Sequence, residues 1–215
     1  MRPARQFSIL RRAAERRLTR LRNRTKSALT QGVSDSERDR VVAYVVLEAQ
    51  NLWSNFVRSY VLSLLGKPRR VLGGRVTIVN LTLTSPGSVL HLAAKATRGP
   101  LALAPVTRRE EPAWHDVNTL LKTCTQIGPS NQSNIIAAMS LQTRVFADLP
   151  TFRNFYAHRN EESARKALDI ARRQYLIMKT NHPTEALGKP AIRRPQALLL
   201  DWLDEMQSVI ELLCD

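Results

Sequence analysis

Cysteine, histidine and long apolar runs are scarce in this chain of 215 residues. Its two cysteines, Cys124 and Cys214, and its four histidines form no Cys-x-x-Cys motif and no His/Cys cluster, so we predict neither a metal site nor a disulfide framework. No stretch approaches the roughly 18 uninterrupted apolar residues of a transmembrane helix, and the N-terminus has no secretory apolar region. We therefore expect a cytoplasmic protein with reduced thiols, no cofactor and no transmembrane segment.

Acidic residues are scarce as well. The chain has 33 Lys and Arg residues against 18 Asp and Glu residues, which gives a formal net charge of +15. From Ala49 to Arg109 there are nine basic residues and no acidic one. Such a surface attracts polyanions, either nucleic acid or an anionic membrane surface, and the charge alone does not distinguish the two.

Residues 1–33 are predicted to form a basic amphipathic N-terminal helix or arm. Residues 1–26 hold ten basic residues and a single acidic one, Glu15. Three interpretations are open: an arm that contacts RNA, a helix docked on the body with its arginines in solvent, and an organelle transit peptide. The first two are favoured, because a transit peptide is usually richer in serine. Apolar residues recur at helical spacing at Phe7, Leu10, Ala14, Leu18 and Leu21.

Residues 34–215 read as one all-α domain, a helical bundle. Ser34 is typical of an N-cap, and it opens a long helix that should stop at Gly66 and Pro68. Residues 67–112 are predicted to be an irregular, Pro/Gly-containing insertion, with a short strand or hairpin arm over 76–83. Further helices are predicted over 114–125, 131–146, 149–160, 162–179 and 194–214.

A polar strip runs beside the apolar stripe of the long helix. Glu48, Asn51 and Asn55 belong to it. In a bundle this helix could run next to another one and present the strip to a shared groove, which would make these three residues supporting members of a site. An ordinary helix boundary carries similar side chains, so both interpretations stay open.

The run from Phe152 to His158 combines an arginine, an amide and an imidazole within about one and a half helical turns. We expect Asp148 to cap a helix that has Pro150 in its first turn, with Phe152 and Tyr156 anchoring it to the core. Asn154 and His158 then share a face, and Arg153 lies about 140° from His158. Alternatively, His158 is a core histidine held by a hydrogen bond, and Arg153 pairs with an acidic residue.

Arg153 and His158 suit the cleavage of a phosphodiester. An imidazole has an ordinary pKa of about 6.5, so it can take a proton from a ribose 2′-hydroxyl or give one to the leaving 5′-oxygen. A guanidinium offers a permanently charged fork that matches phosphate oxygens. The chain shows no clustered Asp/Glu/His set, so a two-metal nuclease is less attractive.

These residues resemble the defining motif of the HEPN superfamily, which is Arg, four to six residues, then His, commonly with a polar residue directly after the Arg. Arg153, Asn154 and His158 match it position by position. The resemblance implies a small all-α, metal-independent endoribonuclease in which two protomers join their motifs and leave 2′,3′-cyclic phosphate and 5′-hydroxyl ends. Such proteins act as toxins, anti-phage effectors or RNA-processing factors. The antitoxin-regulated branch carries a Tyr two residues after the His, where this chain has Asn160.

The expected partners follow from this interpretation. The substrate would be tRNA, mRNA or rRNA, the chain would be a homodimer, and an antitoxin or defence-complex partner is possible. The alternative from another class is a non-catalytic RNA- or DNA-binding subunit of a defence or RNA-processing complex, and a third is an adaptor bundle that addresses a membrane or a partner. The candidate RNA contacts are Arg159, Arg165, Lys67, Arg69 and Arg70.

Overall fold

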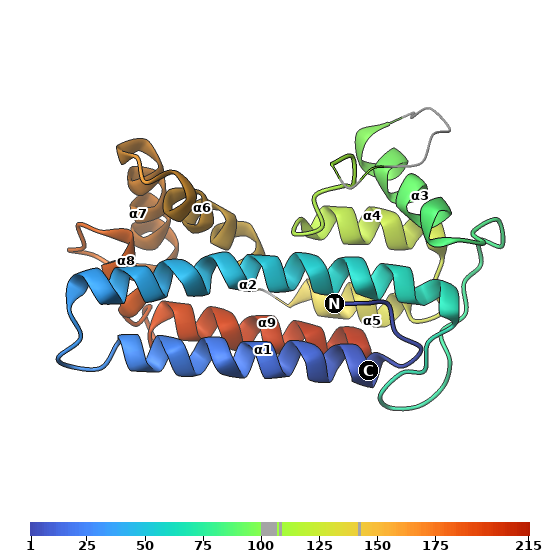
Figure 1. Cartoon of the computed structure of the whole chain (residues 1–215), viewed down its shortest axis with the longest axis horizontal. Helices are drawn as coiled ribbons and strands as arrows, with labels where there is room; N and C mark the ends of the chain where they lie inside the picture. The colour runs from blue at the N-terminus through green and yellow to red at the C-terminus, as the bar shows by residue number, and fades with distance from the viewer. Residues whose placement is uncertain (100–106, 108, 142) are drawn as a thin grey trace. The chain divides into compact units, whose positions relative to one another are not determined.

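The structure, a computed structural model, describes residues 1–99, 107, 109–141 and 143–215. These residues form helices and connections and contain no β-strand, so the all-α prediction is confirmed. None of the described helices is both long enough and apolar enough to span a bilayer. In chain order the helices are α1 (Phe7–Ala28), α2 (Asp35–Ser63), α3 (Pro86–Arg98), α4 (Val117–Ile127), α5 (Gln132–Ser140), α6 (Val145–His158), α7 (Glu161–Tyr175), α8 (Pro183–Gly188) and α9 (Leu198–Cys214) (Figure 1).

Contacts between residues divide the chain into two compact units that cut across the long helices. Unit 1 consists of Met1–Glu15, Leu52–Gln142 and Ser208–Asp215. Unit 2 consists of Arg16–Asn51 and Thr143–Gln207. The boundary predicted between residues 33 and 34 falls in the connection between α1 and α2.

Helix α1 buries the apolar stripe that its sequence predicts. Phe7, Leu10, Ala14, Leu18 and Leu21 are all buried. Burial of large apolar side chains is the main favourable term in folding, so this stripe holds the helix against the rest of the protein. Among the three interpretations of the N-terminal region, the structure therefore supports the docked helix.

Unit 1 has an aromatic centre on the second half of α2. The rings of Phe7 and Tyr60 stack with their centroids 4.7 Å apart, and the amide of Asn131 donates a hydrogen bond of 2.9 Å to the Tyr60 hydroxyl. Helices α3, α4 and α5 belong to the same unit, in which α4 contacts both α3 and α5. Both cysteines also lie in this unit as buried free thiols, and burial raises the pKa of Cys124 to about 12.

The interpretation of residues 67–112 as an irregular insertion is wrong in part. Helix α3 lies within it, because Ser85 forms a capping box with Ser88 and Pro86 occupies the first helical turn. No strand forms over 76–83, where only an isolated bridge joins Ile78 to Pro129. Residues 100–106 and 108 of the insertion lie outside the described part of the chain.

Unit 2 is built from the second half of α1, the first half of α2, helices α6, α7 and α8, and most of α9. Figure 1 shows α6 and α7, in brown, folded back on one another as a helical hairpin. The ring of Phe152 on α6 meets the ring of Trp202 on α9 edge to face, with centroids 5.2 Å apart. The indole of Trp202 also donates a hydrogen bond of 2.9 Å to the Tyr175 hydroxyl on α7.

Helix α6 begins one turn earlier than the sequence predicts. Its first residue is Val145, so Pro150 lies inside the helix instead of in the first turn, and Asp148 is not the N-cap. The carboxylate of Asp148 instead accepts hydrogen bonds from Arg144 at 3.0 Å and from Tyr175 at 2.8 Å. These contacts fix the extra turn, and the helix ends at His158, two residues before the predicted end.

Candidate active site on helix α6

The buried face of α6 fixes the orientation of the motif. Phe152, Phe155 and Tyr156 are buried, as the sequence predicts for Phe152 and Tyr156. The rings of Phe155 and Tyr156 meet edge to face with centroids 4.9 Å apart. Because these three side chains occupy one side of the helix, residues 153, 154 and 158 are directed to the other side.

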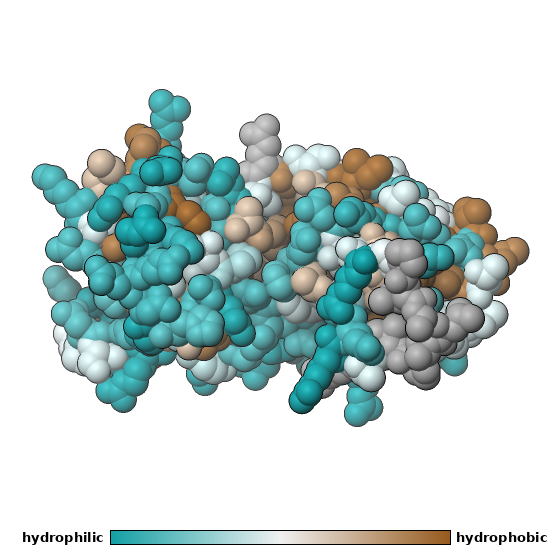
Figure 2. Space-filling view, turned by 90° about the horizontal axis from the view of Figure 1, so that it is seen from above, coloured by the Kyte–Doolittle hydropathy of each residue, from teal (hydrophilic) through white to brown (hydrophobic). Residues whose placement is uncertain are grey.

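Arg153, Asn154 and His158 are all exposed. None of the three side chains makes a hydrogen bond, an ion pair or a ring contact with another residue in the described part of the chain. In Figure 2 the face of unit 2 that carries α6 and α7 is mostly hydrophilic. The alternative of a core histidine with a paired arginine is therefore wrong.

A two-residue corner sets the position of His158. It is the last residue of α6, and Arg159 after it adopts a left-handed conformation with φ of 53°, its N–H donating to the carbonyl of Phe155 at 2.7 Å. Asn160 then caps α7, because its side-chain oxygen accepts a hydrogen bond of 2.8 Å from the N–H of Ser163. The asparagine two residues after His158 thus begins the next helix.

The side chain of Arg159 is held by contacts with other residues of unit 2. Its guanidinium donates a hydrogen bond to the carboxylate of Asp39 on α2 and lies 5.1 Å from the ring centroid of Tyr156. An ion pair combined with a cation–π contact fixes the side chain. Arg159 therefore connects the end of α6 to α2, and it would have to leave these contacts in order to bind RNA.

Asp39 is the centre of a polar cluster next to the motif. Besides Arg159, it accepts a hydrogen bond from the hydroxyl of Thr184 on α8, and Thr184 is bonded to the Tyr156 hydroxyl at 2.8 Å. Burial alone would raise the pKa of Asp39, but the hydrogen bonds from Thr184 and Arg159 and the positive charge of Arg159 lower it below its ordinary value. Burial raises the pKa of Tyr156, so its hydroxyl stays protonated.

His182 belongs to the same cluster and was not singled out by the sequence. Its Nδ1 accepts a hydrogen bond of 3.2 Å from the N–H of Thr184 and caps the short helix α8. Its ring packs edge to face against Phe155, with centroids 5.4 Å apart. The sequence Asn181-His182-Pro183-Thr184 carries the signal of a capped helix start, with proline in the first turn. Such a signal points to a structural histidine.

The predicted supporting residues on α2 are divided between the two units. Glu48 accepts hydrogen bonds from Arg17 on α1 at 3.0 Å and from Asn51 at 3.3 Å, so its carboxylate lies between α1 and α2 in unit 2. Asn55 belongs to unit 1, whereas the motif on α6 belongs to unit 2. The polar strip of α2 is thus shared between the two units.

The remaining predicted RNA contacts differ in whether other residues of the protein already bind them. In unit 1, Lys67 is exposed, Arg69 bonds through its main chain to the carbonyl of Arg5, and Arg70 donates to the carbonyl of Gly73 at 3.1 Å. In unit 2, Arg165 is largely exposed and lies 3.7 Å from Asp169, one helical turn away. Exposed pairs of this kind hold their cations weakly. The bond of Arg69 leaves its exposed side chain free, so Lys67, Arg69 and Arg165 are the more accessible cations of this set.

The described residues contain no group of three His, Cys, Asp or Glu side chains arranged to hold a metal ion. Comparisons with protein-family models, with curated proteins and with solved structures found no match for the chain. The resemblance to the HEPN superfamily therefore rests on the sequence motif of Arg153, Asn154 and His158 alone.

Proposed function

We propose that the protein is a metal-independent endoribonuclease of the HEPN type, which acts in the cytoplasm on tRNA, mRNA or rRNA. One observation carries the proposal: Arg153, Asn154 and His158 project from one helix into solvent without a partner in the described chain. The neighbouring Arg159 is held by Asp39. A cation and an imidazole that perform no structural task are available for a phosphate group.

The proposed reaction is attack by a ribose 2′-oxygen on the adjacent phosphorus. His158 takes the proton from the 2′-hydroxyl as the P–O2′ bond forms, and the P–O5′ bond breaks when the 5′-oxygen receives a proton from a second acid. Arg153 neutralises the charge that gathers on the non-bridging oxygens. Asn154 orients the phosphate or the imidazole through its amide. The products carry a 2′,3′-cyclic phosphate and a 5′-hydroxyl.

A homodimer would supply the second acid. One chain presents a single histidine at the motif, on an open surface. Two-fold pairing of α6 with its copy would bring two His158 side chains to one scissile bond and would exclude water from between them. An antitoxin or defence-complex partner that covered the exposed face of α6 would keep such an enzyme inactive.

Cleavage of labelled RNA in EDTA tests the proposal. Wild type should cut, and His158→Ala should lower the single-turnover rate by at least about 100-fold, because general acid–base catalysis is worth that much. The matched control is His91→Ala on α3, which removes another of the four histidines and should leave the rate unchanged. Equal rates for wild type and His158→Ala would contradict the proposal.

A second candidate function is a non-catalytic nucleic-acid-binding subunit of a defence or RNA-processing complex. It is favoured by the net charge of +15 and by the row of arginines on α1. RNA that stays intact with wild type and with His158→Ala, but shifts in a salt-sensitive gel assay, would favour this function over cleavage.

A further inference from the structure

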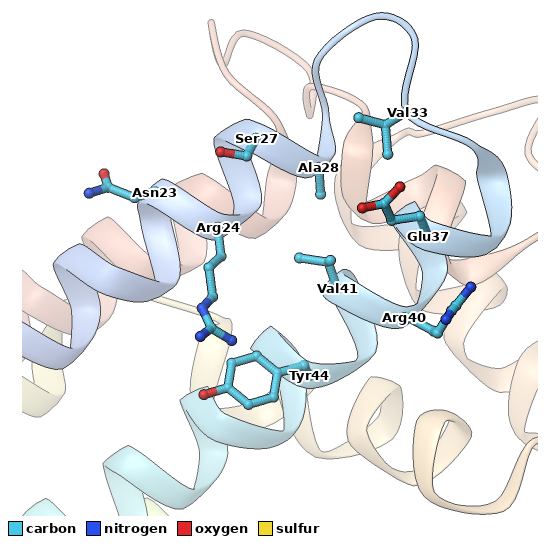
Figure 3. A pocket seen from close by; sticks show the side chains of 9 residues that line it. All are labelled: Asn23, Arg24, Ser27, Ala28, Val33, Glu37, Arg40, Val41 and Tyr44. Carbon is cyan, nitrogen blue, oxygen red and sulfur yellow. The ribbon is translucent and has the colours of Figure 1, made fainter.

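A groove lies in unit 2 between the second half of α1 and the first half of α2. Its volume is about 560 Å³. Figure 3 shows the side chains around it, with those of α1 on one wall and those of α2 on the other. The lining residues are Asn23, Arg24, Ser27, Ala28, Val33, Glu37, Arg40, Val41 and Tyr44.

An exposed aromatic ring stands at one end of the groove. The side chain of Tyr44 is 42% exposed, whereas Tyr60 and Tyr156 are buried. The guanidinium of Arg24 lies over this ring, 4.6 Å from its centroid (Figure 3). A guanidinium stacked on a phenol presents its outer plane as a further stacking surface, and nucleic-acid bases stack on both arginine planes and aromatic rings.

A second hollow of about 240 Å³ continues from the same pair of residues. Arg24 and Tyr44 line both hollows, and Arg17, Arg20, Leu21 and Glu48 complete the second. Residues 17, 20 and 24 share one face of α1, and they span about 10 Å along the helix axis. That length is enough to meet more than one phosphate of a strand.

The arginines around the two hollows differ in whether an acidic residue neutralises their charge. Glu48 pairs with Arg17 at 3.0 Å. Among the described residues, the side chain of Arg20 bonds only to the carbonyl of Arg16, at 3.4 Å, and that of Arg40 only to atoms of Ser36, also at 3.4 Å. Arg20, Arg24 and Arg40 therefore keep their positive charge facing solvent at three points around the two hollows.

The rest of the groove suits a base better than a bare anion. Ala28, Val33 and Val41 give it an apolar wall. The exposed carboxylate of Glu37 and the amide of Asn23 offer hydrogen-bonding groups at its edge, and a carboxylate accepts from base amino groups but repels phosphates. The carboxylate of Glu37 at this edge would repel the anionic headgroups of a membrane or the side chains of an acidic peptide.

We propose that this groove binds single-stranded RNA, with one base stacked on the Arg24–Tyr44 pair and the flanking phosphates held by Arg20 and Arg40. A duplex does not fit this arrangement, since its bases are already stacked within the helix. The proposal rests on the proposed function for the identity of the ligand as the enzyme's RNA, and it adds a substrate class and a binding site away from the motif on α6.

Fluorescence anisotropy with the full chain carrying His158→Ala tests the binding separately from cleavage. The probes are a labelled single-stranded RNA of about 12 nucleotides, the same RNA as a duplex, and anionic phosphatidylserine vesicles. Tyr44→Ala should weaken single-strand binding about 5- to 100-fold, the usual effect of losing one stacking platform, and Tyr44→Phe should keep it within about twofold. Arg20→Ala should lower the slope of log K against log salt by roughly 0.7.

Lys26→Ala is the matched control, because it removes a cation from α1 about 160° away from Arg24 on an ideal helix. Equal affinities for Tyr44→Ala and Lys26→Ala, equal binding of single strand and duplex, or binding of vesicles alone would overturn the proposal. Single-strand binding that depends on Tyr44 in a protein that never cuts RNA would reject the nuclease and keep this site. RNA cleavage that is unaffected by Tyr44→Ala would keep the nuclease and reject this groove as its RNA-binding site.

Discussion

Arg153 and Arg159 lie six residues apart at the end of one helix and differ in almost every contact. Arg159 is bonded to Asp39 and lies over two aromatic rings, and through these contacts it joins α6 to α2. Arg153 is exposed and has no partner in the described chain. The difference shows that an arginine becomes structural when another helix supplies an acidic or aromatic partner for it. Without such a partner its charge stays available to a ligand.

The two histidines of unit 2 repeat the contrast. His182 caps α8 and packs on Phe155, so both its polar and its aromatic contacts serve the fold. His158 ends α6 and has neither kind of contact with a described residue. Both comparisons place the structural contacts in the cluster around Asp39, whereas the side chains of Arg153, Asn154 and His158 are exposed and unpaired in the described chain.

The largest expected effect is on RNA cleavage, and it should distinguish His158 from His182. His158→Ala should lower RNA cleavage at least about 100-fold and leave the melting temperature unchanged, because the side chain is exposed. His182→Ala should keep cleavage and lower the free energy of unfolding by about 0.5–2 kcal/mol, the usual effect of losing an N-cap. Rates and urea unfolding curves for both variants check this pair. Loss of cleavage in His182→Ala with a normal stability would reverse the assignment.

The next largest effect is expected for Arg153, the unpaired arginine of the first comparison. Arg153→Ala should lower cleavage by about 10²–10³-fold, because the charge on the phosphorane would lose its stabilising partner. Arg153→Lys should recover part of the rate, since it restores the charge without the planar fork. Arg173→Ala, an exposed arginine of α7, is the charge-matched control. Single-turnover rates in EDTA measure all three, and equal losses in Arg153→Ala and Arg173→Ala would point to general charge alone.

A smaller effect is expected on stability when the Asp39 cluster is broken. Asp39→Ala removes the acceptor for Arg159 and Thr184 and should lower the free energy of unfolding by about 1–2 kcal/mol, because a partly buried charged hydrogen bond is lost. Asp35→Ala is a control on the same helix, since its side chain is 98% exposed and should matter much less. Urea denaturation at neutral pH gives both values. Equal unfolding free energies for the two variants would mean that Asp39 does not hold α6 to α2.

The smallest effect is the pH dependence of that cluster. The pKa of Asp39 is lower in the folded protein than its ordinary value, so its contribution to stability is fully present above the ordinary carboxyl pKa of about 4. It is lost as the pH falls through the lowered folded pKa. Urea midpoints between pH 7 and pH 3 should therefore fall more steeply for wild type than for Asp39→Asn. Parallel curves would show that Asp39 is not paired in solution.

Local signals in the sequence predict the helices with long apolar stripes. The stripes of α1 and α9 are visible as residues at helical spacing, and burial of such stripes is what makes these helices stable. Helix α3 is missed because Ser85, Pro86 and Gly87 read as breakers, although a serine followed by proline also begins a helix. In this chain Pro86 thus marks the start of a helix in a segment that was predicted to be irregular.

Contacts over long sequence separations could not be predicted in the same way. Nothing near Arg159 in the sequence indicates Asp39, which lies 120 positions away, and nothing near Glu48 indicates Arg17. The bond from Tyr175 to Asp148 appears only once α6 and α7 pack, whereas the ion pair of Asp148 with Arg144 spans a single helical turn. The motif residues themselves are predicted from sequence, but which neighbours are free to help them depends on these tertiary pairs.

Chemical analysis of the RNA ends tests the central claim most directly. RNA cut by wild type in EDTA should carry 2′,3′-cyclic phosphate and 5′-hydroxyl ends, and an RNA whose 2′-oxygens are methylated should stay intact, because the 2′-oxygen is the attacking group. Mass spectrometry of the fragments distinguishes these ends from those made by metal-dependent hydrolysis. Fragments with 5′-phosphate ends, or cleavage of the methylated RNA, would contradict the assignment of His158 and Arg153.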